Sequence, residues 1–176
     1  RGFDYVHETT GPWATSRTDS LMTDHWAQLG LLTTFRQDYE RRRGNPAAVW
    51  PSPLPTEEHP DAYVGRQACA LLGDYRADRP LCLFVGFPGP HEPWDAPGEY
   101  AEMYDPADMP AAIPAPAAPA WVSDAAREYA GRGRFGHLTP DDFARISANY
   151  YGKISLIDHW IGRILQAQRD RGRLDD

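Results

Sequence analysis

The side chains best suited to chemistry lie in residues 81–97, LCLFVGFPGPHEPWDAP, where an apolar run stops at a Gly/Pro turn. His91 follows that turn and stands between Pro90 and Pro93, which limit the directions open to its ring. In α/β proteins, ligands bind in the crevice outside the carboxyl ends of the strands. An imidazole held there can donate a hydrogen bond to an anionic oxygen or carry a proton near neutral pH. We therefore predict that His91 is catalytic, with its ring in a hollow at the rim of a sheet. The alternative, a histidine that only bonds a neighbouring carbonyl, stays open.

Two neighbours of His91 are candidates for the same crevice. We predict that Trp94 binds substrate beside His91, and Asp95 follows it directly. The alternatives are a loop anchor for Trp94 and a turn residue for Asp95, which are common roles of these residue types in loops. Glu92 is expected to be solvated.

Other polar residues carry weaker signals. Lys153 and Asp158 lie at the edges of an apolar helical stripe, where we expect a structural ion pair rather than catalysis. His159 falls opposite that stripe and is expected to face solvent. His59 stands at a helix start without any pattern of partners. Residues 131–136, GRGRFG, follow a helix-like stretch rather than a strand, so they predict a loop and not a nucleotide-binding turn.

Hydrophobic periodicity predicts the elements that position these residues. We expect helices at residues 20–43, 61–75 and 140–169. Gly30 is expected to break the first of them in two. Residues 81–87 are apolar without alternation, which predicts a central strand covered on both faces. The 17 prolines and 15 glycines predict long loops. Helices together with a strand covered on both faces predict an α/β fold, in a single domain over residues 1–176.

The start of the last predicted helix carries a capping signal. Thr139 can accept a hydrogen bond from the backbone at Asp142, and Asp142 can reach back in the acidic version of a capping box. Pro140 suits the first helical position, because its fixed φ matches a helix and the N–H it lacks would have no partner there.

Charge and composition exclude several classes of function. The net charge of −7 disfavours nucleic acid as a partner, because binding its phosphates needs a basic face. No apolar run approaches the ~20 residues that span a bilayer, so no membrane partner is expected. Cys69 and Cys82 have apolar neighbours and no Cys-x-x-Cys or Cys/His spacing, so we expect reduced core residues and no metal ligands. Cytoplasm and periplasm both stay open as compartments.

Three stretches together resemble the type I sulfatases of the alkaline phosphatase superfamily, which include phosphonate monoester hydrolases. Residues 1–4, RGFD, resemble the Gly-Phe-Asp that follows the family's Lys/His segment. Residues 79–100 resemble its strand and Pro-His-x-Pro loop, and residues 150–165 resemble the helix before its Asp-His/Asp-Asn-Gly metal motif. The resemblance implies a partial alkaline-phosphatase-like sulfatase domain in which His91 contacts the sulfate or phosphonate group near the leaving oxygen.

Other parts of the family's site have no counterpart in this sequence. Cys69 is followed by Ala-Leu-Leu and Cys82 by Leu-Phe-Val, so neither matches the family's Cys-x-Pro-x-Arg, whose cysteine becomes formylglycine. The N-terminal Asp-Asp pair that binds calcium in the family is missing as well. The resemblance therefore implies calcium and formylglycine for the complete enzyme, with ligands and nucleophile outside this chain. No metal or cofactor is expected on this chain alone.

These features predict an internal segment of a sulfatase that acts on small-molecule sulfate esters and is inactive by itself. Two alternatives stay open. One is a phosphonate or phosphate ester hydrolase of the same superfamily, and the other is a non-catalytic scaffold or interaction module. One strand cannot form a sheet, so the other strands must come from segments outside this chain, from strands that the sequence does not reveal, or from another copy of the chain. Exposed strand edges would favour self-association into a homo-oligomer.

Overall fold

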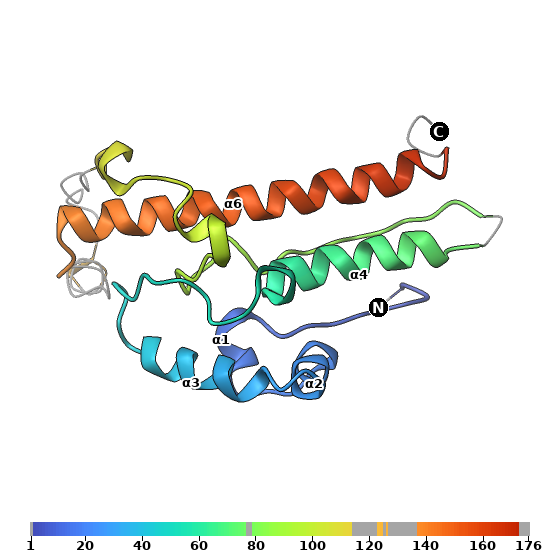
Figure 1. Ribbon diagram of the computed structural model, residues 1–176, viewed down its shortest axis with the longest axis horizontal. Coiled ribbons are helices and arrows are strands. Elements are labelled where there is room, and N and C mark those ends of the chain that lie inside the picture. Colours follow the sequence, from blue (N-terminus) through green and yellow to red (C-terminus); the bar gives the residue numbers. More distant parts are fainter. Residues whose placement is uncertain (1, 77–78, 114–122, 125, 127–136, 173–176) are drawn as a thin grey trace.

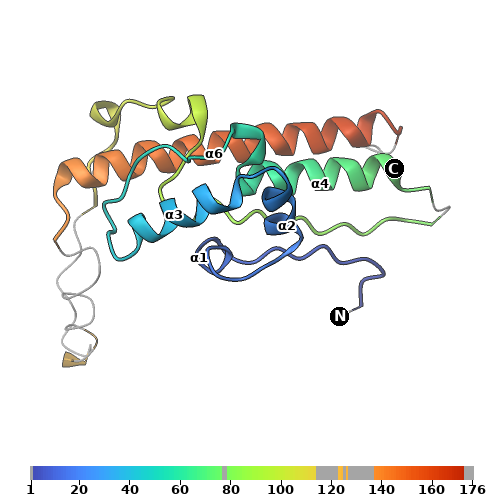
Figure 2. The same cartoon turned by 60° about the horizontal axis from the view of Figure 1, so that its bottom comes forward.

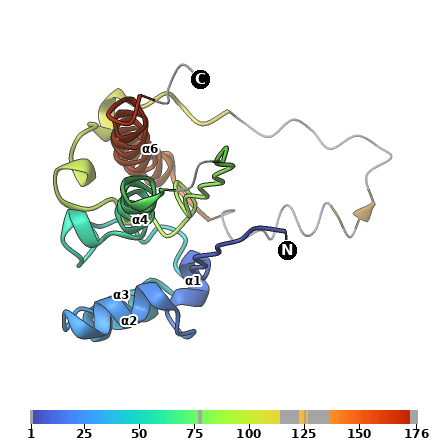
Figure 3. The same ribbon diagram turned by 90° about the vertical axis from the view of Figure 1, so that its right-hand side faces the viewer.

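The computed structural model describes residues 2–76, 79–113, 123, 124, 126 and 137–172. Its α-helices are α1 (Pro12–Thr15), α2 (Leu21–Gln28), α3 (Leu32–Arg42), α4 (Pro60–Asp74) and α6 (Pro140–Arg169). Short 3-10 helices join them: η1 (Thr56–Glu58), η2 (Gly98–Ala101) and η3 (Pro106–Asp108). Helices α4 and α6 lie side by side and run in the same direction, with α1, α2 and α3 in a layer beneath α4 (Figures 1 and 3).

Helix α6 begins with the capping box that the sequence predicts. Thr139 Oγ1 accepts a hydrogen bond from the backbone N–H of Asp142 at 3.2 Å, and the Asp142 carboxylate accepts one from the backbone N–H of Thr139 at 2.9 Å. The hydrogen bonds from Thr139, first from its backbone, lower the pKa of Asp142 to about 2. The predicted helix over 140–169 is confirmed. Neither α6 nor any other helix of the described residues is apolar enough over a sufficient length to cross a membrane.

The predicted break in the first helix is also confirmed. Helix α2 ends at Gln28, and Gly30 adopts a φ of +73°, in the left-handed region that favours glycine. Helix α3 then begins at Leu32, so the prediction of residues 20–43 corresponds to two helices. The prediction of a helix over 61–75 is confirmed by α4, which spans Pro60–Asp74.

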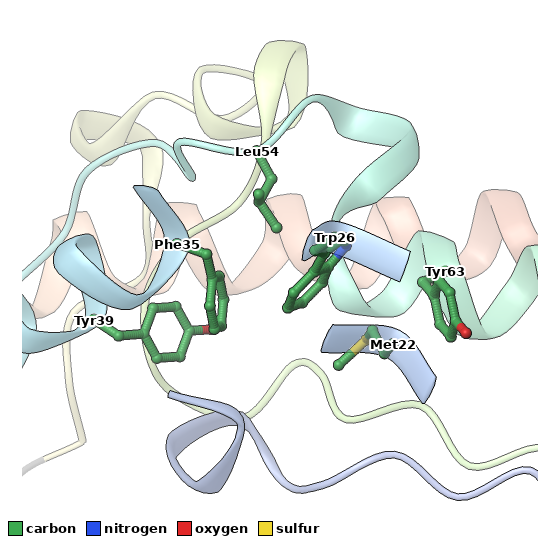
Figure 4. Close-up of a cluster of buried hydrophobic side chains, with 6 residues drawn as sticks. All are labelled: Met22, Trp26, Phe35, Tyr39, Leu54 and Tyr63. Carbon is green, nitrogen blue, oxygen red and sulfur yellow. The ribbon is translucent and has the colours of Figure 1, made fainter. Parts of the chain in front are cut away.

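An aromatic cluster joins the lower layer to the start of α4. It consists of Met22, Trp26, Phe35, Tyr39, Leu54 and Tyr63, all buried (Figure 4). The ring centroids of Trp26 and Phe35 are 4.6 Å apart, and those of Phe35 and Tyr39 are 4.1 Å apart. Burial of such large rings is the main stabilising contribution here, about 1.5–3 kcal/mol for a side chain of this size. The cluster therefore fixes α2 and α3 against α4.

The contact between α4 and α6 is close enough to require glycine. A Cβ atom on Gly65 of α4 would lie 2.6 Å from the indole of Trp160 on α6. The two helices lie side by side along most of α4 in a second view (Figure 2) and are in contact with each other. Leu156 of α6 packs with Ala62 of α4 and with Ala96 and Tyr100. Helices α4 and α6 and the segment that follows His91 therefore meet in one hydrophobic cluster.

The predicted central strand over 81–87 is not confirmed, and the described residues form no sheet. The segment is extended but makes no backbone hydrogen bond to another described residue, and a strand needs such a partner. Side chains at odd positions, from Leu81 to Phe87, are half-buried, and those at even positions are exposed. Phe84 is 80% exposed. The described part of the molecule therefore covers one face of this segment and not both.

Candidate functional site

Residues 89–96, here called the histidine loop, are held at both ends by helix side chains. The backbone N–H of Gly89 donates to Asp61 Oδ1 of α4 at 2.7 Å. A Cβ atom at Gly89 would lie 2.3 Å from the same carboxylate, so this approach requires glycine. At the other end, the backbone N–H of Ala96 donates to Asn149 Oδ1 of α6 at 3.2 Å. The loop is therefore fixed between α4 and α6.

The fully buried guanidinium of Arg42, at the end of α3, ties the loop to the third helix. Its Nη1 donates to the carbonyl of Trp94 at 3.0 Å, and its Nη2 donates to the carbonyls of Trp50 and Pro51 at 3.0 and 3.1 Å. Its charge is paired with Asp38, at 2.5 Å from Nε. Arg42 thus joins the histidine loop to residues 48–51.

Asp95 is the centre of a buried polar cluster. Tyr39 donates its hydroxyl to Oδ2 at 2.9 Å, and Lys153 donates to Oδ1 at 2.9 Å. Burial alone would raise the pKa of Asp95, but the charge of Lys153, a hydrogen bond from His59 and the charge of Arg42 outweigh it and hold the pKa far below its usual range. Burial and the Asp95 carboxylate together raise the pKa of Tyr39, so its hydroxyl stays a donor.

His59 completes this cluster at the start of α4. Its Nδ1 accepts a hydrogen bond from the backbone N–H of Asp61 at 3.3 Å, which places the ring proton on Nε2. That nitrogen faces Asp95 Oδ1 at 3.5 Å, and the ring is 1% exposed. The imidazole of His59 therefore separates two buried carboxylates, and its role here is structural.

The ring of His91 points away from this buried cluster and is exposed. Its Nδ1 lies 2.7 Å from the carbonyl oxygen of Glu92. A carbonyl oxygen only accepts, so Nδ1 carries a proton, and in the neutral ring Nε2 presents a lone pair. Nε2 has no hydrogen-bond partner among the described residues. The open alternative, a bond to a neighbouring carbonyl, is thus observed at one nitrogen, and it leaves the other available. That His91 is catalytic stays a prediction.

The surroundings of His91 differ from the hollow that the sequence predicts. A shallow hollow beside the loop is lined by Trp13, Arg42, Glu92 and Trp94 among others, and His91 does not line it. A hollow at a strand end needs the neighbouring strands of a sheet to form its walls, and the described residues supply none. The expectation of an enclosed ring at a sheet rim is therefore not met in this part of the chain.

The neighbours of His91 act as anchors. Trp94 is half-buried and donates from Nε1 to the carbonyl of Pro46 at 3.1 Å, which is the loop-anchor alternative. Substrate binding by Trp94 stays a prediction. Glu92 is half-buried, and its carboxylate accepts from Trp13 Nε1 at 3.3 Å, so the expectation of a fully solvated side chain is wrong.

The remaining sequence predictions have mixed outcomes. Lys153 forms the expected structural ion pair, whereas Asp158 forms none with the described residues. His159 and Asp158 are exposed. Cys69 is half-buried and burial raises its pKa, whereas Cys82 is exposed, so the prediction of a core residue is wrong there. The predicted loop at residues 131–136 lies outside the described residues.

Comparison with known proteins identifies the family. The sulfatase family model matches residues 2–176. The chain belongs to the sulfatase family. An arylsulfatase of Clostridium perfringens (strain 13 / Type A) is 31% identical to this sulfatase chain over 121 residues, which cover 67% of the chain and 24% of the relative. The multifunctional alkaline phosphatase superfamily protein PehA of Trinickia caryophylli is 31% identical over 139 residues, covering 72% of the chain and 27% of the relative. The chain spans about a quarter of the length of these relatives.

The described residues of this sulfatase chain do not fit the calcium and formylglycine that the resemblance implies. No group of three or more His, Cys, Asp or Glu side chains within the described ranges is arranged to hold a metal ion. The carboxylates of Asp61 and Asp95 face different ring nitrogens of His59, and Lys153 is paired with Asp95. The sequence after Cys69 and Cys82 lacks the required motif.

Sequence reasoning missed the buried cluster behind the histidine loop. His59, Asp61 and Asp95 are distant in sequence from Lys153, and no local pattern links them. One signal was present: Lys153 is the single lysine among the 18 Lys and Arg residues, and it lies next to the apolar stripe of α6.

Proposed function

We propose that this chain is the part of a sulfate ester hydrolase that presents His91 to the anionic group of the substrate. Membership of the sulfatase family supports a hydrolase of this superfamily. The observation that carries the proposal is the contrast at residue 91: the ring is exposed and its Nε2 has no partner among the described residues, whereas the backbone of its loop is fixed by buried charges. A fixed ring with an open nitrogen is what recognition of an anion requires, because the donor is aimed before the substrate arrives.

In this proposal His91 acts through Nε2. With Nδ1–H committed to the Glu92 carbonyl, a proton taken up at Nε2 makes the ring a cation that donates to a sulfate oxygen. The same proton can pass to the leaving oxygen as the ester bond breaks. One preorganised donor of this kind contributes about 2.7–4 kcal/mol to the transition state.

The nucleophile and the metal belong to other parts of the complete gene product in this proposal. Formylglycine would supply the attacking oxygen and calcium would stabilise the anion, and neither fits the described residues of this chain. We therefore expect no turnover by residues 1–176 alone. The proposed partners are small-molecule sulfate or phosphonate esters.

The proposal is tested by replacing single histidines with alanine in the complete gene product and measuring hydrolysis of an aryl sulfate and an aryl phosphonate monoester. His91→Ala is expected to lower kcat by about 10²–10³-fold. His159→Ala is the matched control, because His159 is an exposed histidine whose ring contacts only Trp160 among the described residues. Equal activity of His91→Ala and the control would refute the role of His91. A higher kcat/KM on the phosphonate than on the sulfate would favour the phosphonate alternative.

We also propose that residues 81–87 form a strand once another strand is paired with them. The alternating burial of the segment is the pattern of a strand with one face packed. In the complete gene product we expect Cys82, on the open face, to be protected from alkylation until urea is added. Rapid alkylation of Cys82 in the folded protein would show that this face stays uncovered and would favour the interaction-module alternative. A chain that is dimeric in sedimentation would instead support self-association through this edge.

A further inference from the structure

Lys153 makes contacts that go beyond an ion pair. It is 2% exposed in the middle of α6. Its Nζ lies 2.9 Å from the carbonyl oxygen of His91, 3.0 Å from that of Pro93 and 2.9 Å from Asp95 Oδ1. A lysine ammonium has three N–H donors, so these three acceptors use all of them.

Two of these three acceptors are backbone groups on either side of Glu92. The carbonyl of Glu92 between them accepts the Nδ1–H of the His91 ring. Lys153 therefore fixes the chain immediately before and after the peptide group that orients the ring. A rotation of the chain around Glu92 would break the Nδ1 hydrogen bond and release the direction of Nε2.

We propose that Lys153 is a positioning residue for His91, acting through the carbonyls of His91 and Pro93. The inference rests on the proposed function, since it assumes that the ring must face a substrate anion. Lys153 is buried behind the loop, so it takes no part in binding that substrate. Its competing role is purely electrostatic, as the counter-charge of Asp95.

Two variants of the complete gene product separate these roles. Lys153→Met keeps an unbranched side chain of similar size and removes all three donors, but it leaves the buried Asp95 carboxylate without its lysine counter-charge. The double variant Lys153→Met, Asp95→Asn also removes that charge, so it tests the loss of the carbonyl contacts with less electrostatic damage. Ser155→Ala is the control, because Ser155 lies on the same helix and bonds Tyr104 rather than the histidine loop.

The readouts are kcat, KM, the melting temperature and the tautomer of His91 from ¹⁵N-histidine NMR. Misplacing a reacting group by about 1 Å can cost 10²-fold, so we expect kcat to fall about 10²-fold in both Lys153 variants, with KM changed much less. The double variant is expected to regain melting temperature but not kcat. His91 is expected to lose its pure Nδ1–H signal in both variants and to keep it in Ser155→Ala.

Recovery of kcat together with melting temperature in the double variant would overturn the inference, because Lys153 would then serve Asp95 alone. An unchanged Nδ1–H signal of His91 in Lys153→Met would overturn it as well. If the wild-type gene product hydrolyses neither ester, the proposed function fails, and the NMR comparison still decides whether Lys153 positions the ring.

Discussion

Replacing Gly152 by alanine tests how closely α6 must approach the segment after the histidine loop. A Cβ atom at Gly152 would lie 2.0 Å from the backbone oxygen of Tyr100 and 3.5 Å from the Cβ of Ala96. A C···O contact is normally about 3.3 Å, so the backbone of η2 or the axis of α6 would have to move by roughly 1 Å. Gly162 lies on the same helix and is exposed, and a Cβ there would meet nothing within 4 Å.

Replacing each of these two glycines by alanine is therefore expected to change the free energy of unfolding in opposite directions. Alanine is favoured over glycine inside a helix by about 0.8–1.0 kcal/mol, and this gain applies at both positions. Overpacking costs about 1–3 kcal/mol, and the upper value suits a clash with backbone, which cannot rotate away. We expect Gly152→Ala to lower the free energy of unfolding by about 2 kcal/mol and Gly162→Ala to raise it by about 1 kcal/mol.

The assay is urea unfolding of the complete gene product and of both variants at pH 7, followed by tryptophan fluorescence. Trp160 of α6 makes the signal sensitive to this helix. If Gly152→Ala stabilises the protein as much as Gly162→Ala does, the close contact between α6 and η2 does not exist, and the packing around the histidine loop as described is wrong.

Three further predictions concern single contacts. Asp95→Asn is expected to cost about 1–3 kcal/mol of stability at pH 7. The pKa of Asp95 is depressed in the fold, so its contribution is complete above the unfolded value of about 3.9 and declines as the pH falls below it; urea unfolding should therefore show a smaller gap between wild type and variant at pH 3 than at pH 7. Thr139→Ala removes the cap of α6, which lowers stability by about 1 kcal/mol in thermal unfolding, and NMR titration should show the pKa of Asp142 rising from about 2 toward its usual range. Trp94→Phe loses the hydrogen bond to Pro46 and is expected to cost about 1 kcal/mol in urea unfolding; a raised KM in the same variant would support substrate binding by Trp94, and an unchanged KM would leave it as an anchor.

The helices could be predicted because their signals are local. Thr139, Pro140 and Asp142 form a start signal within four residues, and the structure confirms both the cap and the helix. Gly30 marks the break between α2 and α3 because a positive φ suits glycine. Such signals depend on a few neighbouring residues and not on the rest of the fold.

The strand prediction shows where local reasoning ends. Residues 81–87 read as a segment buried on both faces, because their apolar run is continuous. Their composition shows that the side chains are suited to burial. The backbone hydrogen bonds of a strand need a partner strand, and burial of the second face needs another segment packed against it. Both depend on other segments, and the described residues cover a single face.

At the candidate site, too, local signals could be predicted from the sequence and long-range contacts could not. His91 could be found from its own neighbours, because prolines and a preceding apolar run are adjacent in sequence. The contact between Lys153 and Asp95 joins residues 58 positions apart, and no periodicity connects them. His91 could therefore be singled out as a candidate from the sequence, whereas neither the exposure of its ring nor the buried support behind it was predicted.

The prolines of the histidine loop explain why buried cations support it. Pro90 and Pro93 have no N–H, so this loop carries more carbonyl acceptors than backbone donors and cannot satisfy itself. Hydrogen-bond donors for these carbonyls must therefore come from residues outside the loop. Only Lys and Arg carry several donors and no acceptor on one side chain. Lys153 donates to two carbonyls of the loop and to the carboxylate of Asp95. Arg42 donates to four carbonyls, one in the loop and three in residues 48–51. The same prolines that set His91 in place thus create the need for the buried charges behind it, and the carboxylates of Asp95 and Asp38 follow because those charges must be paired.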